Sequence, residues 1–324
     1  MKVETALRQG HDLLCVGAVG APALTAEILL AHALHRDRVY LLAHPEHELT
    51  EREWIHYGRY LHERLQGKPT QYITRTQEFW GREFHVEEGV LIPRPETELV
   101  VEAALAWWGG LPSPRRASRP RIVDIGAGVR GADVSVPDAE IRVGGAGIPA
   151  CSVDICVDDP RVLDIGTGSG ILAVTLALET TARVSASEVS AVALRIAREN
   201  AARLGAKVDF VQCDLAAAFA DASFDLIVSN PPYIATAELA ALQREVRDWE
   251  PREALDGGPD GLDVYRRLIP EAARLLRPGG WLILEIGATQ GESVVGLLGQ
   301  GWTDVSVTSD LAGLPRVVKA RRSS

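Results

Sequence analysis

The chain has 324 residues, which is long enough for one large domain or two modest ones. Its formal net charge of −10 argues against a protein whose main task is to bind nucleic-acid phosphates. No apolar stretch is long enough to span a bilayer, and the N-terminus lacks the apolar block of a signal peptide, so we expect a cytoplasmic protein without membrane contact. The four cysteines are too few and too scattered for a disulfide framework or a complete zinc site, and no metal is expected.

Residues 1–75 predict a small helical domain. Apolar residues recur with a helical period over 21–35. Thr50 and Glu53 have the spacing of a capping box at the start of the next helix. Residues 76–95 then bring aromatic and β-branched residues around two glycines, a pattern that indicates a β-hairpin. We expect this hairpin to link the helical domain to the rest of the chain.

Residues 96–324 predict an α/β domain. A helix begins at Pro95 and Glu96, where early acidic residues suit the positive end of the helix dipole. Strands and helices then alternate, which is typical of a parallel sheet covered by helices on both faces. The expected strands cover residues 161–166, 183–188, 208–214, 224–230 and 280–287, and two late strands, 303–310 and 315–321, could close the sheet as an antiparallel pair.

Residues 121–128 nearly repeat residues 161–168, with Arg, Asp, Ile and two Gly at matching positions. The stretch after the first copy is rich in Gly, Pro and Asp and lacks the apolar period of a helix that covers a sheet, whereas the stretch after the second copy has that period. We therefore assign the first strand of the sheet to the second copy and interpret about 121–160 as an atypical insertion or partial duplication. That insertion could form an extra hairpin, an edge strand or a disordered loop, or it could compete for the central position.

A glycine-rich turn joins the strand of the second copy to the following helix. Gly166, Gly168 and Gly170 allow the backbone to turn tightly and to approach a ligand closely; an ordinary strand-to-helix turn is the alternative. The next strand ends in Glu188, which could accept hydrogen bonds from both hydroxyls of a ribose. The G-x-G-x-G spacing fits an adenosyl ligand without a pyrophosphate better than a nicotinamide cofactor, so we predict S-adenosylmethionine.

The third strand brings Asp214 and Leu215 to the same edge of the sheet. Ligands of such sheets bind beyond the carboxyl ends of the strands, so these two residues could border the adenine. A turn-forming aspartate is the alternative for Asp214.

The fourth strand delivers Asn230 to this edge, followed by Pro231, Pro232 and Tyr233. The prolines fix φ and remove two backbone donors, which leaves the Asn230 side-chain carbonyl and the Pro231 backbone carbonyl as stiff acceptors. Such a pair suits a planar –NH2 group, and Tyr233 supplies a ring or a hydroxyl beside it. An amide nitrogen held in this way is oriented for methyl transfer, and its developing positive charge is stabilised. An ordinary Asn-Pro-Pro turn is the alternative.

These stretches resemble the bacterial protein-(glutamine) methyltransferases that modify peptide chain release factors, a family of class I S-adenosylmethionine-dependent enzymes. The likeness covers nearly the whole chain except about 121–160. It rests on the stretches QYITRTQEFWGREFHVEEGVLIPRPETELVVE, VLDIGTGSGILAVTLA, ARENAARLG, FDLIVSNPPYI, ALDGGPDGLDVYRRL and LRPGGWLILEIG. The hairpin and the IPRPETE block distinguish this family from most other users of Asn-Pro-Pro-Tyr.

The resemblance implies a seven-stranded Rossmann-like methyltransferase sheet, joined by the β-hairpin to a small helical domain that docks the release factor. It implies methyl transfer from S-adenosylmethionine to the side-chain amide nitrogen of the glutamine in the Gly-Gly-Gln motif of release factors. The implied cofactor-binding residues are Gly166, Thr167, Gly168, Ser169, Gly170, Glu188, Asp214, Leu215 and Asn230. The implied catalytic residues are Asn230, Pro231 and Tyr233, and the implied substrate-binding residues are Asn230, Pro231, Pro232, Tyr233, Arg94 and Glu98.

Other functions stay open from the residues alone. An enzyme that methylates a ribosomal-protein glutamine, or an exocyclic amine of a nucleic-acid base, would use the same acceptors because those groups are planar too. The acidic balance and the lack of a DNA-binding motif argue against nucleic acid. A binding-only protein, with a cofactor pocket disrupted by the insertion, is the alternative to an enzyme. We expect a release factor as partner, no direct nucleic-acid contact and a monomeric chain.

Overall fold

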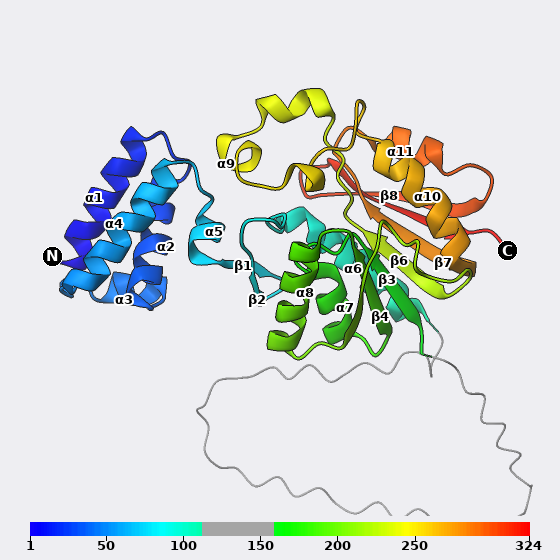
Figure 1. The fold of residues 1–324 in the computed structure, drawn as a ribbon, viewed down its shortest axis with the longest axis horizontal. Helices are drawn as coiled ribbons and strands as arrows, with labels where there is room; N and C mark the ends of the chain where they lie inside the picture. The colour runs from blue at the N-terminus through cyan, green and yellow to red at the C-terminus, as the bar shows by residue number, and fades with distance from the viewer. Residues whose placement is uncertain (112–158) are drawn as a thin grey trace, which may run out of the picture.

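The computed structural model describes residues 1–111 and 159–324 (Figure 1). The first copy of the glycine repeat, at 121–128, and nearly all of the expected insertion lie outside the described residues. In the described part of the chain, no helix is long and apolar enough to cross a membrane.

Five helices form an N-terminal unit with its own apolar core, at one end of the molecule (Figure 1). The α4 helix begins with the expected capping box, in which Thr50 and Glu53 each bond the backbone N–H of the other. An ion pair between Arg64 and Glu245 ties α4 to the short helix α9 (Arg244–Arg247), far along the chain. The helices of this unit are α1 (Val3–Val16), α2 (Pro22–Leu34), α3 (Arg38–Ala43), α4 (Glu51–Leu65) and α5 (Thr70–Thr74).

A two-stranded antiparallel hairpin follows, formed by β1 (Thr76–Phe79) and β2 (Arg82–His85). The side chains of Phe79 and Phe84 are buried in the core of the α/β part. One face of the hairpin therefore packs into this core and anchors the hairpin to the sheet domain. In the sequence, the hairpin directly follows the helical unit.

The large sheet has seven strands in the order β5-β4-β3-β6-β7-β9-β8. The strand of the second glycine copy, β3, lies between β4 and β6 and pairs with both in parallel register, as predicted. The two last strands pair antiparallel at one edge, as expected. The strands are β3 (Arg161–Ile165), β4 (Arg183–Glu188), β5 (Val208–Gln212), β6 (Phe224–Ser229), β7 (Leu276–Glu285), β8 (Trp302–Ser309) and β9 (Pro315–Arg322).

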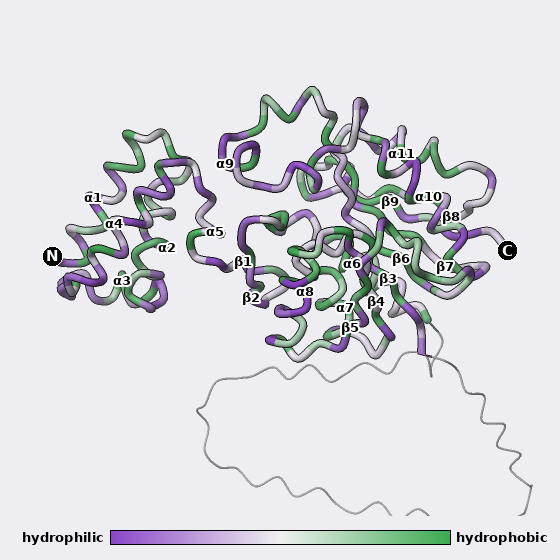
Figure 2. The backbone as a smooth tube through the Cα atoms, in the orientation of Figure 1, coloured by the Kyte–Doolittle hydropathy of each residue, from purple (hydrophilic) through white to green (hydrophobic). Residues whose placement is uncertain are grey.

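Helices cover both faces of this sheet, as Figure 1 shows. One face packs mainly against α6 (Glu98–Gly110) and α7 (Ile171–Glu179), with help from α8 (Ala191–Leu204). The other face packs against α10 (Asp263–Leu275) and α11 (Gly291–Leu297). Both faces of the central strands are therefore apolar, and Figure 2 shows hydrophobic residues concentrated in this central layer. The remaining short helices are η1 (Pro95–Thr97), η2 (Thr236–Ala241), α9 (Arg244–Arg247) and η3 (Arg252–Ala254).

The predicted elements differ most from the structure at two boundaries, the starts of α6 and of β7. The α6 helix begins at Glu98, because Pro95 opens a separate 3-10 turn before it. β7 begins at Leu276, earlier than the expected Gly280, and the register jumps between the pairs Phe224–Leu276 and Leu226–Trp281. Gly279 and Gly280 therefore lie at a bulge within β7, whereas the expected strand began only at Gly280.

Candidate active site

A cavity of about 640 Å³ opens at the carboxyl ends of the parallel strands. Loops that follow β3, β4, β5 and β6 form its floor, and the segment after the hairpin forms a side wall. In an open α/β sheet this edge is where ligands bind. Eight of the nine residues predicted to bind the cofactor line this cavity, and Gly170 does not: the eight are Gly166, Thr167, Gly168, Ser169, Glu188, Asp214, Leu215 and Asn230.

The glycine turn exposes its backbone to this cavity. Gly166, Gly168 and Gly170 have φ of 72°, 56° and 88°, a conformation that favours glycine. A Cβ on Gly166 or Gly168 would meet open space, whereas a Cβ on Gly170 would lie 3.1 Å from Ala197 of α8. The first two glycines therefore leave room for a ligand, and the third allows two helices to pack closely.

Asp164 lies beneath the turn and holds it. Its Oδ2 accepts from the Thr167 hydroxyl at 2.6 Å and from the Ala173 N–H at 3.1 Å. Its Oδ1 is buried and has no hydrogen-bond partner among the described residues. Burial raises the pKa of this carboxyl to about 7. A cavity-lining carboxylate with a free acceptor is suited to a cationic or N–H-bearing ligand.

Glu188, the last residue of β4, is hydrogen-bonded to the glycine turn. Its two oxygens accept from the backbone N–H groups of Gly168, at 2.9 Å, and Ser190, at 3.0 Å. Ser190 in turn caps α8 through the Ala193 N–H. Glu188 is 9 % exposed and faces the cavity, so its remaining lone pairs are available to hydroxyl donors.

Asp214 and Leu215 follow β5 at the far side of the cavity. Asp214 forms an exposed ion pair with Arg267 of α10 at 2.5 Å, and Arg267 itself lines the cavity, which the sequence pattern did not indicate. Leu215 has a φ of 47°, an uncommon conformation for a residue with a Cβ. These two residues offer an apolar surface and a charged rim at the site where we expect the adenine.

A second cavity of about 300 Å³ adjoins the first. Four residues line both cavities: Leu91, Asn230, Pro231 and Ala254. Tyr233 and Arg94 line the second cavity alone, and Pro232 lines the first. The acceptor segment 230–233 therefore stands at the junction of a large cavity and a small one. Groups bound in the two cavities would meet beside Asn230 and Pro231.

A hydrogen bond on the side away from the cavities fixes the Asn230 side chain. Its Nδ2 donates to the Thr97 hydroxyl at 3.2 Å, which leaves Oδ1 as the free acceptor. The Tyr233 hydroxyl donates to Oε1 of Glu285 at 3.4 Å, and burial followed by the Glu285 charge raises the pKa of Tyr233. The sequence analysis did not identify Thr97 or Glu285 as neighbours of the site. The sequence signal for Glu285 was an acidic residue at the carboxyl end of a central strand.

A loop that we call the glycine strap, residues 256–263, clamps the chain after the prolines. The Ile234 N–H donates to Leu255 at 3.0 Å, and the Gly257 N–H donates back to Ile234 at 2.8 Å. A Cβ on Gly257 would lie 2.9 Å from the Pro232 carbonyl oxygen, and one on Gly261 would lie 2.3 Å from that of Tyr233. The strap therefore packs backbone to backbone against the acceptor segment.

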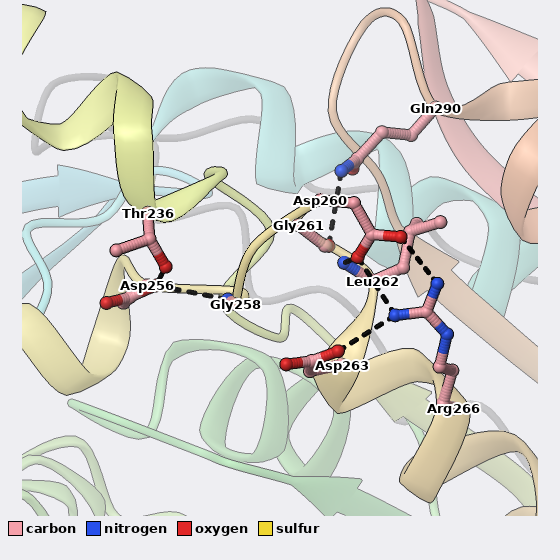
Figure 3. A network of polar contacts seen from close by, with 9 residues as sticks. All are labelled: Thr236, Asp256, Gly258, Asp260, Gly261, Leu262, Asp263, Arg266 and Gln290. Carbon is pink, nitrogen blue, oxygen red and sulfur yellow. Dashed lines mark hydrogen bonds and ion pairs between the residues drawn. The ribbon is translucent and has the colours of Figure 1, made fainter.

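Side chains lock the strap in its conformation (Figure 3). The Gln290 Nε2 donates to the carbonyls of Tyr233, at 2.9 Å, and Gly261, at 3.2 Å. Asp256 accepts from the Thr236 hydroxyl at 2.6 Å, and Asp260 pairs with Arg266 at 2.5 Å. The hydrogen bonds to Arg266 lower the pKa of Asp260 to about 2. Both ends of the strap are thus fixed to neighbouring elements.

Arg94 and Glu98, the last two predicted substrate-binding residues, take different places. Arg94 lines the second cavity and pairs at 2.6 Å with Glu250, a buried carboxylate that also accepts from the Ile92 N–H at 3.1 Å. Glu98 lines neither cavity; its carboxylate accepts from the Trp80 N–H at the hairpin turn, at 2.8 Å. The structure therefore places Glu98 at the hairpin turn, where it satisfies a backbone donor, and its predicted contact with the substrate stays a prediction.

The sheet order and the cavity over its carboxyl edge define a Rossmann-like methyltransferase. Two family models match, described as "PrmC N-terminal domain" over residues 5–74 and "Methyltransferase small domain" over residues 153–248. Among curated proteins, a release factor glutamine methyltransferase of Koribacter versatilis is 40% identical over 93% of this chain and 92% of its own length. The proteins of the same name from Chlorobaculum tepidum and Moorella thermoacetica are 41% and 38% identical, over 92% and 99% of this chain and 90% and 99% of their own. The chain belongs to the release factor glutamine methyltransferase family.

Solved structures of other methyltransferases are also similar. The 16S rRNA N2 G1207 methyltransferase of Thermus thermophilus, solved with AdoMet and guanosine, gives a TM-score of 0.47 at 20% identity, over 76% of this chain and 49% of that one.

Proposed function

We propose that this protein transfers a methyl group from S-adenosylmethionine to the side-chain amide nitrogen of the glutamine in the Gly-Gly-Gln motif of a peptide chain release factor. The observation that carries the proposal is the position of Asn230 and Pro231 in the shared wall of two cavities. The large cavity takes the cofactor and the small one takes the glutamine side chain, so the two reacting groups meet at that wall.

The residues of the large cavity fit an adenosyl cofactor. Gly166 and Gly168 leave open space beside their backbone, and Glu188 presents carboxylate oxygens to ribose hydroxyls. The buried Oδ1 of Asp164 has no partner among the described residues and can accept from the amino group of a methionine moiety, directly or through water. When bound, the cofactor supplies an electrophilic methyl group on a sulfonium.

Asn230 and Pro231 orient the accepting nitrogen. An amide nitrogen is a weak nucleophile because its lone pair is conjugated with the carbonyl. Asn230 Oδ1 and the Pro231 carbonyl accept its two hydrogens, fix its plane and stabilise the positive charge that develops on it. Leu91 and Ala254 border both cavities and give their junction an apolar lining. After transfer, the extra proton on the methylated nitrogen is acidic and passes to solvent water, so no strong base is needed.

The helical unit of residues 1–75 supplies the docking surface for the release factor in this proposal. Its Arg64 pairs with Glu245 of α9, and Gln243 and Val246 beside that residue line the small cavity. A partner seated on the helical unit is thus held close to the entrance for its glutamine. A cytoplasmic location and a monomeric chain stay predictions.

The experiment is methyl transfer from labelled cofactor to purified release factor, to ribosomal protein and to nucleic acid. We expect label in the release factor alone, lost when the motif glutamine is replaced by alanine. Label in nucleic acid alone would overturn the proposal. Calorimetry on the full chain and on a version without 121–160 tests the cofactor pocket, and we expect both to bind; binding by the shortened version alone would favour a pocket disabled by the insertion.

A further inference from the structure

Residues 242–250, which we call the α9 segment, form one side of the small cavity. Leu242, Gln243 and Val246 line that cavity, and none of these described residues lines the large one. The segment contains the short helix α9 and lies on the side of the sheet domain that faces the helical unit (Figure 1). Its position therefore sets the shape of the small cavity and leaves the large cavity unchanged.

The α9 helix is too short to hold this position by itself. Its backbone hydrogen bonds are local: the Val246 N–H donates to the Gln243 carbonyl at 3.0 Å, and the Glu250 N–H donates to the Val246 carbonyl at 3.1 Å. Isolated helices of this length are unstable in water. Contacts from other elements must therefore fix the α9 segment.

Glu250 fixes the C-terminal end of the segment. Its buried carboxylate accepts from the Arg94 guanidinium at 2.6 Å and from the Ile92 N–H at 3.1 Å. Both partners belong to the stretch that follows the hairpin, so this end of the α9 segment is held by the sheet domain itself.

Glu245 fixes the α9 helix, and its partner belongs to the helical unit. Arg64, the penultimate residue of α4, donates from Nη2 to Oε2 of Glu245. Within the described parts of the chain, no other side chain of α9 forms a hydrogen bond or ion pair with a residue outside 236–256. The position of α9 therefore depends on a residue of the helical unit.

The surroundings of Arg64 favour this pairing over others. Its side chain is 9 % exposed, whereas that of Glu245 is 33 % exposed. Its Nη1 donates to the Lys68 carbonyl at 3.3 Å, and its Nε is buried without a hydrogen-bond partner among the described residues. A buried guanidinium needs its counter-ion. Movement of Glu245 away from Arg64 would leave a desolvated charge unpaired, so the pair resists displacement of α9.

We propose that Arg64 is a positioning residue for the substrate: through Glu245 it sets the place of Gln243 and Val246 at the side of the small cavity. The identity of the substrate side chain in that cavity rests on the proposed function. The helical unit then has a role inside the site, in addition to the docking surface proposed for it. A substrate fragment too short to reach the helical unit would still depend on Arg64.

Hydrogen exchange followed by mass spectrometry tests the positioning without any substrate. In Arg64→Met, we expect the amides of 242–250 to exchange about 10-fold faster or more, because local opening of the segment becomes easier. Strand β3 and helix α10 should keep their wild-type rates. Arg59→Met is the matched control, since Arg59 lies on the same helix and pairs at 3.6 Å with Glu63 of α4. Unchanged exchange of 242–250 in Arg64→Met, or an equal rise in every segment, would overturn the inference.

A double substitution tests whether Arg64 acts through Glu245. Arg64→Met and Glu245→Met should each speed exchange of the α9 segment. The combined variant should exchange no faster than the faster of the two single variants, because both substitutions break one and the same contact. Effects that multiply in the combined variant would contradict the route through Glu245.

Kinetics on a short peptide that contains Gly-Gly-Gln give a second readout for an active wild type. Arg64→Met should raise KM for the peptide by about 5- to 10-fold, the loss of roughly one hydrogen bond. It should leave kcat within about 3-fold, because contacts with the side of the cavity are the same in the ground state and the transition state. Affinity for S-adenosylmethionine should not change, since the α9 segment lies outside the large cavity.

The two readouts separate this inference from the proposed function. A raised KM for the whole release factor, with the peptide unaffected, would reduce Arg64 to a docking contact and overturn the inference. If the wild type methylates neither the release factor nor the peptide, the proposed function fails, and the exchange measurement still decides whether Arg64 positions the α9 segment.

Discussion

The Gly168 backbone N–H donates to the Glu188 carboxylate at 2.9 Å, which joins the glycine turn after β3 to the tip of β4. The pair links two elements that parallel pairing already places side by side. Glu188 thus shapes the turn and also presents oxygens to the cavity, so its loss should affect cofactor binding before it affects chemistry.

Replacing Glu188 with alanine should weaken binding of S-adenosylmethionine by about 10- to 100-fold, the equivalent of one or two hydrogen bonds to a charged group. Isothermal titration calorimetry measures the affinity. Glu199→Ala, on the exposed face of α8, removes only a surface pair with Arg195 at 2.8 Å and serves as the matched control. Equal affinities in the two variants would contradict the role assigned to Glu188.

Replacing Asn230 with alanine should lower kcat for release factor methylation by about 10²- to 10³-fold, because it removes a polar group aimed at the charge that develops in the transition state. Cofactor affinity should change little, since the glycine turn and Glu188 remain. Rates come from labelled methyl transfer, with Thr308→Ala on the exposed strand β8 as control. A rate within a few-fold of the wild type would defeat the catalytic assignment.

Replacing Gly257 with alanine should displace the acceptor segment, because the new Cβ would lie 2.9 Å from the Pro232 carbonyl oxygen. We expect a loss of stability of about 1–3 kcal/mol, as for overpacking elsewhere, together with a fall in kcat. Thermal unfolding and methyl transfer are the measurements. Gly296→Ala on α11, where a Cβ meets nothing within 4 Å, is the matched control, and identical behaviour of the two variants would argue against the strap as a support.

The free energy of unfolding should depend on pH through Glu285. Its folded-state pKa of about 7 lies above the usual glutamate value of about 4.3, so between these values the folded state binds more protons and the free energy of unfolding falls as pH rises. Glutamine does not titrate, so Glu285→Gln should gain stability relative to the wild type from pH 5 to pH 8. Urea unfolding at both pH values gives the difference, and an unchanged difference would contradict the raised pKa.

Much of the site followed from the sequence because parallel strands bring their carboxyl ends to one edge. Gly166, Glu188, Asp214 and Asn230 each follow or end a strand, and knowing the alternation of strands and helices was enough to place them together. The apolar pattern after the second repeat also identified the correct central strand, β3.

The supporting contacts did not follow from the sequence, because they depend on how distant elements pack. Thr97 meets Asn230 across 133 residues, and Glu250 reaches Arg94 across 156. Glu98 lies one residue from Thr97 but bonds the hairpin turn, and no local pattern distinguishes these two roles. Local sequence patterns identify the residues at strand ends, whereas the residues that contact them are determined by the tertiary fold.

The two prolines at 231 and 232 have a consequence for substrate choice. Neither proline has a backbone N–H to offer the site, and one of the two hydrogens of the Asn230 side-chain amide is donated to Thr97. A glutamate has nearly the shape of a glutamine but would bring a negative oxygen against this wall, where repulsion excludes it. We expect a release factor whose loop glutamine has deamidated to compete poorly for this acceptor wall, although Arg94 lines the same small cavity.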